Sequence, residues 1–173
     1  MKFKTFLAGC LGGLLSLNSC TNSPDMTDYT AYVNPFIGTG GHGHTFPGAI
    51  VPHGMISPSP DTRIDGWDAC SGYYYADSTI NGFSHTHLSG TGCCDYGDVL
   101  LMPTVGEQKY LPTGSQSQQM AYASAFSHQN ETAEPGYYSV FLDTYQVKAE
   151  LTASKRAAIH RYTFPESKEA DRK

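Results

Sequence analysis

The sequence has few basic residues and little tryptophan, and the first shortage excludes one class of partner. It contains 11 Lys and Arg against 16 Asp and Glu, which gives a formal net charge of −5 at pH 7. Proteins that bind nucleic acid gather Lys and Arg against the phosphates, and no such basic patch is visible here. Nucleic acid is therefore not an expected partner. Trp67 is the only tryptophan.

Long apolar segments are also missing. The apolar run at residues 6–17 is too short to remain in a bilayer as a spanning helix. Because Lys2 and Lys4 precede it, we interpret residues 1–19 as an export signal.

The export signal ends in Leu17-Asn18-Ser19-Cys20, which resembles a bacterial lipobox. In such a motif the cysteine is lipidated and becomes the new N-terminus. We therefore expect Cys20 to carry a lipid anchor, residues 20–30 to form a polar tether, and the protein to be a bacterial cell-envelope lipoprotein of the periplasm or outer membrane. The alternative is an ordinary cleaved signal with an incidental cysteine.

Glycine, proline and tyrosine are plentiful instead, with 18, 10 and 12 residues respectively. This mixture favours a β-rich and loop-rich fold over a helical one. A length of 173 residues fits one domain with a core of its own.

The stretch 61–98 has the composition of a binding site. It holds six aspartates and is interrupted by glycine every few residues, so neither a helix nor a long strand can run through it. Tight loops that fix polar and aromatic groups in place are a common way to build a site. A polar surface loop without function is the alternative.

Trp67 and Asp68 are the best candidates for a ligand contact within this stretch. A ligand with an apolar face and a rim of hydroxyls needs an aromatic platform and short polar groups. Asp68 can accept hydroxyl hydrogen bonds, and Arg63 is close enough in sequence to orient its carboxylate. The alternative for Trp67 is a packing role in the core.

Two histidine pairs add further candidates. His42 and His44 lie in a glycine-rich loop that begins at Gly38, where the backbone must turn sharply or approach a ligand. His85 and His87 would share one face of a strand with Phe83, and we expect both pairs to support the site around Trp67 and Asp68. A four-histidine zinc site is the minority alternative, because histidines that hydrogen-bond a ligand or a neighbouring backbone suit the sequence equally well.

The cysteines of this stretch leave several possibilities open. Cys70 can pair with Cys93 or Cys94 in an oxidising compartment, whereas the adjacent Cys93 and Cys94 would form a strained ring. Free thiols are equally acceptable. A zinc site from Cys70, Cys93 and His85 is conceivable, but the spacing is unusual for one.

Strand patterns follow towards the C-terminus. We predict a short buried strand at residues 99–102, a strand apolar on both faces at 137–142, an alternating strand at 145–153 and another at 157–164. Turns at Pro135-Gly136, Asp143-Thr144 and Ser154-Lys155-Arg156 would join them into an antiparallel meander. The predicted fold class is all-β, an antiparallel β-sandwich.

Several long motifs resemble the N-terminal region of glycoside hydrolase family 92. They are NPFIGTGGHGHTFPGA, SPDTR, GWDACSGY, GFSHTHLSGTGC, GDVLLMP, AEPGYYSV, AELTAS and HRYTFP, and they extend in order from Val33 to Pro165. Such density makes the resemblance specific. It implies a calcium-dependent, inverting exo-α-mannosidase that releases terminal α-1,2-linked mannose from N-glycans or yeast mannan.

The resemblance also implies that most of such an enzyme lies outside this sequence. In the family an N-terminal β-sandwich precedes a helical barrel, and the catalytic carboxylates and most calcium ligands belong to the barrel. We therefore expect residues 31–173 to be a truncated N-terminal domain with an unfinished sheet, and no catalytic residue of its own. Its Trp67 loop would form one wall of the sugar pocket. The alternatives are a stand-alone carbohydrate-binding lipoprotein and a histidine-based metal-binding lipoprotein.

Overall fold

The computed structural model describes residues 27–63, 65–94, 96–109 and 119–166. The predicted export signal, Cys20 and most of the tether lie outside these ranges, as does the charged end of the chain. Within the described ranges the secondary structure consists of β-strands and three short 3-10 segments, η1 (Tyr29–Tyr32), η2 (Trp67–Ala69) and η3 (His128–Asn130). None of the described helices is long and apolar enough to cross a membrane.

The main sheet has four antiparallel strands in sequence order: β5 (Glu131–Glu134), β6 (Tyr137–Leu142), β7 (Val147–Ala153) and β8 (Ala158–Thr163). The predicted turn at Pro135-Gly136 joins β5 to β6, with Gly136 at a φ of 77°. The turn at Ser154-Lys155-Arg156 joins β7 to β8 and is closed by a hydrogen bond from the Ser154 N–H to the Ala157 carbonyl. The predicted meander is confirmed.

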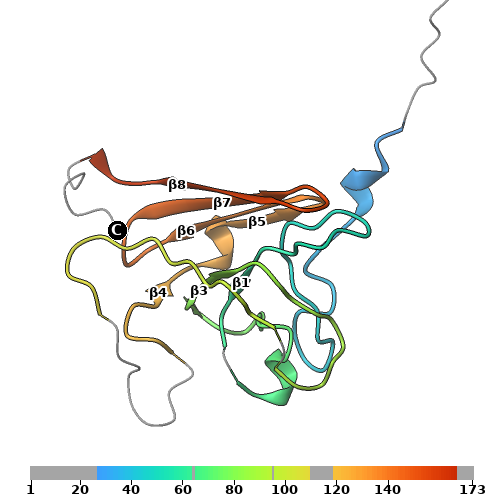
Figure 1. Ribbon diagram of the computed structural model, residues 1–173, viewed down its shortest axis with the longest axis horizontal. Coiled ribbons are helices and arrows are strands. Elements are labelled where there is room, and N and C mark those ends of the chain that lie inside the picture. The colour runs from blue at the N-terminus through green and yellow to red at the C-terminus, as the bar shows by residue number, and fades with distance from the viewer. Residues whose placement is uncertain (1–26, 64, 95, 110–118, 167–173) are drawn as a thin grey trace, which may run out of the picture.

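Two small antiparallel sheets form a second layer with the loops beneath the main sheet (Figure 1). One pairs β1 (Ser59–Asp61) with β3 (Gly82–Ser84), and the other pairs β2 (Thr79–Ile80) with β4 (Ser124–Ala125). The core lies between the layers. It joins Ile80 and Phe83 from the small sheets to alternate residues of β6 and β7: Tyr138, Val140, Leu142, Val147, Ala149 and Leu151. The all-β, antiparallel fold class is therefore confirmed.

Strand β6 has the predicted bounds, and β8 shows the predicted alternation. His160 and Tyr162 are half-buried on one face of β8, whereas Ile159 and Arg161 are exposed on the other. Strand β7, by contrast, begins two residues later than predicted. Residues 143–146 turn the chain, with Gln146 at a φ of 56°.

The predicted buried strand at residues 99–102 is wrong. Val99 is exposed and has a φ of 59°, and this segment contributes only an isolated bridge between Leu101 and Phe83. The predicted strand carrying Phe83, His85 and His87 on one face ends early, because β3 stops at Ser84. The chain then turns so that the side chains of Ser84 and His87 meet. His85 and His87 consequently point to different surroundings.

Candidate functional site

The loop at residues 38–45 is closed by its own backbone. The Thr45 N–H donates to the Gly38 carbonyl at 3.2 Å, and the Gly43 N–H donates to the Gly40 carbonyl at 3.3 Å. A Cβ atom on Gly43 would lie 2.1 Å from the Gly38 carbonyl oxygen, so only glycine fits where the two ends of the loop meet. Gly38, one of the predicted site residues, therefore shapes the loop through its backbone.

This loop brings two histidines to one carboxylate. His42 Nδ1 lies 2.5 Å from Asp68 Oδ1, and His44 Nε2 lies 3.7 Å from the same oxygen. The His42 side chain is 73% exposed, whereas that of His44 is 8% exposed. The Gly90 N–H donates to the His44 carbonyl and helps to hold that backbone, which has a φ of 53°.

Trp67 lies over the same two histidines. It begins η2 directly after Gly66, whose φ of 97° turns the chain sharply. The indole is 5.1 Å from the His42 ring and 4.4 Å from the His44 ring, measured between centroids, and it meets the His44 ring almost at a right angle. Trp67 is 56% exposed, which excludes the core-packing alternative. It offers an aromatic surface to solvent.

Asp68 is held as a carboxylate. The hydrogen bond from His42 lowers the pKa of Asp68, partial burial opposes this, and the charge of His42 adds to the lowering. A short acceptor therefore lies beside the exposed indole. His44 Nε2 is buried and has no hydrogen-bond partner. An indole, a carboxylate and an unsatisfied imidazole nitrogen together suit a ligand that has both hydroxyls and an apolar face.

Arg63 does not orient Asp68, which corrects our expectation. Its guanidinium binds Asp77 instead, with the Nε–H and Nη2–H groups at 2.7–3.0 Å from the carboxylate oxygens. It also stacks over the Tyr74 ring at 4.4 Å. The carboxylate of Asp77 is closer in space although Asp68 is closer in sequence. Arg63 therefore fixes the loop behind the site.

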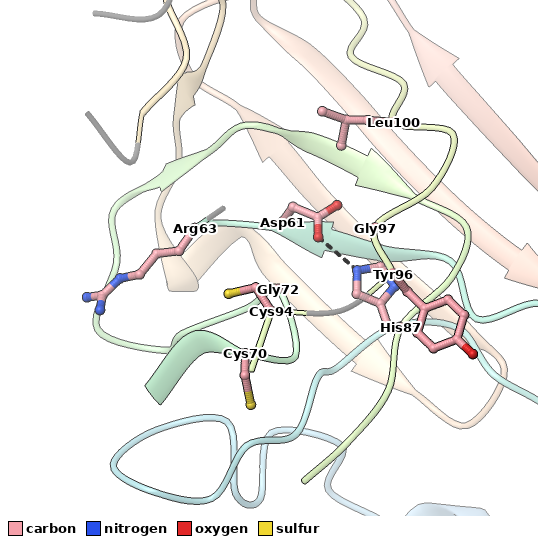
Figure 2. Close-up of a pocket in the computed structure, with 9 residues that line it drawn as sticks. All are labelled: Asp61, Arg63, Cys70, Gly72, His87, Cys94, Tyr96, Gly97 and Leu100. Carbon is pink, nitrogen blue, oxygen red and sulfur yellow. Dashed lines mark hydrogen bonds and ion pairs between the residues drawn. The ribbon is translucent and has the colours of Figure 1, made fainter. Parts of the chain in front are cut away.

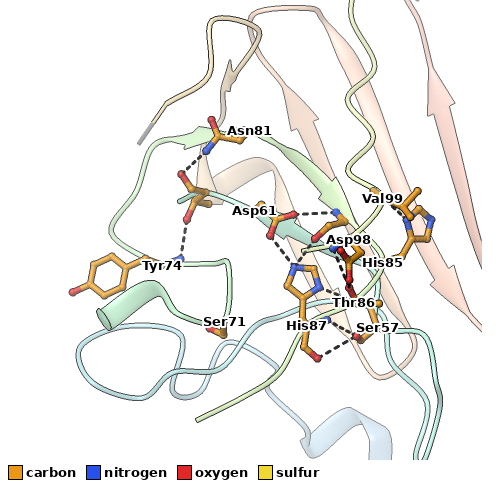
Figure 3. Close-up of polar contacts among 12 residues, drawn as sticks. Ser57, Asp61, Ser71, Tyr74, Asn81, His85, Thr86, His87, Asp98 and Val99 are labelled. Carbon is orange, nitrogen blue, oxygen red and sulfur yellow. Dashed lines mark hydrogen bonds and ion pairs between the residues drawn. The ribbon is translucent and has the colours of Figure 1, made fainter. Parts of the chain in front are cut away.

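His87 belongs to a buried polar network behind the site (Figure 3). Its Nδ1–H donates to the Ser57 carbonyl at 2.8 Å, and its Nε2 lies 2.9 Å from Asp61 Oδ1. The same Nε2 lies 3.0 Å from the Ser84 hydroxyl, so both ring nitrogens of His87 are engaged by protein groups. The second Asp61 oxygen accepts the Ser84 N–H at 3.0 Å.

His85 lies apart from the other three predicted site histidines. Its Nδ1–H donates to the Val99 carbonyl at 2.8 Å, and its ring stacks on His160 of β8 at 4.6 Å. Burial lowers the pKa of His160 to about 4, and the charge of His85 adds to this. In the described residues the four histidines therefore form no common cluster. The four-histidine zinc alternative is wrong.

The three cysteines of the described ranges are free thiols. Cys70 is buried and Cys94 is exposed, and both line a pocket with Asp61 and His87 (Figure 2). The Cys94 thiol donates to the Gly66 carbonyl at 3.6 Å, and burial raises its pKa, with a smaller contribution from Cys70. The only described group of three or more His, Cys, Asp and Glu residues with metal-ligand spacing is His42, His44 and Asp68, so Cys70, Cys93 and His85 do not form the alternative zinc site.

A buried network on Glu131 was not predicted. Its carboxylate accepts hydrogen bonds from the Tyr73 and Tyr138 hydroxyls and from His128 Nδ1. Burial and the Glu131 charge raise the pKa of both tyrosines. Tyr73 and Glu131 are 58 residues apart in sequence, so no local pattern could have indicated their contact. The network joins the site-bearing loops to the main sheet.

Comparison with known proteins identifies the family of the chain. A model of the glycosyl hydrolase family 92 N-terminal domain matches residues 32–172. The chain belongs to glycoside hydrolase family 92. The resemblance seen in the sequence motifs is thereby confirmed.

Three relatives illustrate the match of this family 92 chain. A family GH92 α-mannosidase from Bacteroides thetaiotaomicron, solved in complex with mannoimidazole, is 50% identical, with a TM-score of 0.74 over 79% of this chain. A family GH92 inverting mannosidase from the same species is 32% identical, with a TM-score of 0.65 over 84% of this chain. An uncharacterised secreted glycosidase from Arthroderma benhamiae is 32% identical over 80% of this chain.

The family 92 chain corresponds to a small part of each relative. It covers 18% of the first α-mannosidase, 19% of the inverting mannosidase and 18% of the fungal glycosidase. The geometry described above therefore concerns an N-terminal region, and the activity of the longer relatives is a matter for proposal.

Proposed function

We propose that this chain is the N-terminal part of a calcium-dependent, inverting exo-α-mannosidase that releases terminal α-1,2-linked mannose from N-glycans or yeast mannan. Its His42, His44, Trp67 and Asp68 side chains form one wall of the sugar pocket. The observation that carries this proposal is the exposed indole of Trp67 beside the Asp68 carboxylate. Support comes from the 50% identical α-mannosidase, which was solved with the ligand mannoimidazole.

Four other predicted site residues support this wall by positioning its parts: Gly38, Arg63, His85 and His87. Arg63 holds Asp77, His87 pairs with Asp61 beneath the site, and Gly38 shapes the histidine loop. Their contacts are to protein groups, which favours a positioning role over direct sugar contact. His85 is tied to the Val99 carbonyl and to His160, so its support is the most remote.

The catalytic carboxylates belong, in this proposal, to the part of the enzyme beyond this chain. Inversion requires an acid and a base about 6.5–9.5 Å apart, with room for a water molecule. Four of the six aspartates of the site stretch are engaged with protein groups: Asp61 with His87, Asp68 with His42, Asp77 with Arg63 and Asp98 with Thr86. Such partners favour structural and binding roles for them.

Calcium would likewise be held mainly outside this chain. Calcium takes six to eight oxygen ligands. The candidate metal group in the described residues offers two imidazoles and a single carboxylate, which does not fit that requirement. Calcium dependence therefore rests on the family resemblance, and chelation followed by calcium addition to the full-length protein tests it.

The envelope location remains part of the proposal. Lipidation of Cys20 would tether the domain to a bacterial membrane, since the several acyl chains of a lipoprotein hold more firmly than one. Mass spectrometry of membrane-extracted protein should find acylated Cys20. An unmodified N-terminus in the soluble fraction would overturn this part.

The proposal is tested with α-1,2-mannobiose. The full-length protein should release mannose, first as the inverted β-anomer, which NMR detects. The purified 173-residue chain should release none above a vector control and should be less stable than the full-length protein, because exposed apolar surface and β8, an edge strand of the described sheet, favour aggregation. Hydrolysis by this chain alone would contradict the proposal. Mannobiose binding by a full-length protein that does not hydrolyse it would favour the carbohydrate-binding alternative.

A further inference from the structure

The group formed by His42, His44 and Asp68 also has the residue types and the spacing of a metal site. One potential ligand atom from each residue lies within 4.8 Å of those from the other two. His44 Nε2 is buried, lacks a hydrogen-bond partner and lies 3.7 Å from Asp68 Oδ1. That distance is too long for a hydrogen bond. A buried, unsatisfied nitrogen that faces a carboxylate across this distance indicates a missing group between them.

We propose that His42, His44 and Asp68 bind a divalent cation of the zinc class. Zinc binds imidazole nitrogen and carboxylate oxygen at about 2.0–2.2 Å, which places the ligand atoms of a tetrahedral site roughly 3.3–3.6 Å apart. The gap between His44 and Asp68 is close to this value without any rearrangement.

His42 must move to complete the site. Its Nδ1 is 2.5 Å from Asp68 Oδ1, so the two atoms must separate by about 1 Å for both to reach one zinc ion. The His42 side chain is 73% exposed and can rotate, whereas the buried His44 supplies the fixed ligand. The cation replaces the hydrogen bond between His42 and Asp68.

The ligand types select the metal. Two imidazoles and one carboxylate suit zinc, cobalt, nickel and copper, whereas calcium and magnesium require oxygen ligands. Three protein ligands leave a fourth position for water, as in open zinc sites. The site is therefore distinct from the calcium dependence that the family resemblance implies.

Cation binding concerns the same wall as the proposed sugar contact, but it does not depend on mannosidase activity. A cation on Asp68 would occupy the acceptor that a sugar hydroxyl uses, so zinc and mannoside should compete. Metal binding is measured without sugar. Its failure would leave the mannosidase proposal intact, and a failure of mannoside hydrolysis would leave a measured metal site intact.

The probe is cobalt(II), followed by its visible absorption, with zinc added in competition. Trp67 gives a second signal, because its ring lies 4.4 Å and 5.1 Å from the two histidine rings and it is the only tryptophan of the chain. The 173-residue chain is used in a Cys93→Ser, Cys94→Ser background, since exposed free thiols are potential zinc ligands. We expect one cobalt ion per chain, displaced by zinc, with quenching of Trp67, and no effect of calcium.

Variants assign the ligands. His42→Ala removes an exposed side chain, and His44→Asn removes the imidazole while keeping a residue that tolerates the φ of 53°. Each should weaken cobalt and zinc binding by at least about 10–100-fold, which is the loss typical when only a hydrogen-bond partner of a metal ligand is removed. His53→Asn, at an exposed position with a φ of 58°, is the matched control and should change nothing.

Two results would overturn the proposal. One is unchanged metal affinity in His42→Ala, which can be read even if the buried His44 variant folds poorly. The other is metal binding that disappears in the Cys93→Ser, Cys94→Ser background itself, which would assign the metal to the thiols.

Discussion

The indole of Trp67 meets the imidazole of His44 at an interplanar angle of 87°, with the ring centroids 4.4 Å apart. One partner is exposed and the other is buried, so the contact links the surface of the candidate site to the loop that shapes it. The position of the exposed aromatic surface thus depends on the fold of residues 38–45.

Replacement of Gly43 by alanine should disrupt the histidine loop. The added Cβ would lie 2.1 Å from the Gly38 carbonyl oxygen, a backbone atom that cannot move aside cheaply. We expect a loss of about 1–3 kcal/mol in the free energy of unfolding of the full-length protein, measured with denaturant.

Gly40→Ala is the matched control for this loop. Its Cβ would meet only the Tyr75 Cβ, at 3.6 Å, which is ordinary contact, and its backbone lies outside the positive-φ region. We expect a change below about 1 kcal/mol. Equal destabilisation by the two alanines would show that the close approach of Gly43 to Gly38 does not hold the loop.

Arg63 should couple energetically to Asp77 and not to Asp68. The guanidinium makes charge-assisted hydrogen bonds to Asp77, and both side chains are mostly buried, with 26% and 14% exposure. A double-mutant cycle of Arg63→Met with Asp77→Asn should give a coupling of about 1–2 kcal/mol in unfolding free energy. The cycle of Arg63→Met with Asp68→Asn should give a value near zero. A larger coupling of Arg63 to Asp68 than to Asp77 would support the role first expected for Arg63, which is to orient the Asp68 carboxylate.

Acid should weaken the main sheet through Glu150. Hydrogen bonds from Arg161, then Tyr137, with a further one from Lys148, lower the pKa of Glu150 to about 2, against an ordinary value of 4.5. A carboxyl group whose pKa is lowered by folding stabilises the fold fully at a pH above its ordinary pKa. This stabilisation is lost as the pH falls towards the pKa of the folded state. The denaturant concentration at the midpoint of unfolding should therefore decrease as the pH is lowered from 4.5 to about 2.

Variants isolate this acid effect. Glu150→Gln should flatten the pH dependence over that window, and Arg161→Leu should reduce it, because Arg161 makes the largest contribution. Glu134→Gln, at an exposed position of β5, is the control and should leave the dependence unchanged. A profile that Glu150→Gln does not alter would assign the acid sensitivity to other carboxyls.

The sequence predicted strands well where one local pattern decided the outcome. The bounds of β6 and the alternation along β8 follow from apolar residues that meet the core. The alternating pattern predicted for β7 would place Glu150 on the exposed face, yet Glu150 is buried under Arg161, Tyr137 and Lys148. Tyr137 and Arg161 belong to the neighbouring strands β6 and β8, so a single-strand pattern could not include them.

Contacts within the candidate site were predicted less well. From residue types and family motifs, the sequence predicted one site that contains Trp67, Asp68, His42 and His44. The structure places these four residues next to one another. It paired Arg63 with the wrong aspartate, since distance along a glycine-rich chain says little about distance in space. It also gave His85 and His87 a common face that the turn after Ser84 removes.

The most direct test of the central claim is the catalytic efficiency of Trp67→Ala in the full-length protein on α-1,2-mannobiose. If Trp67 is a wall of the sugar pocket, loss of its platform should remove about 1–3 kcal/mol of binding, so kcat/KM should fall roughly 5- to 150-fold. Tyr32→Ala, which removes another exposed aromatic at the far end of the described chain, should leave kcat/KM unchanged. An unchanged kcat/KM in Trp67→Ala, with the fold intact by circular dichroism, would contradict the account.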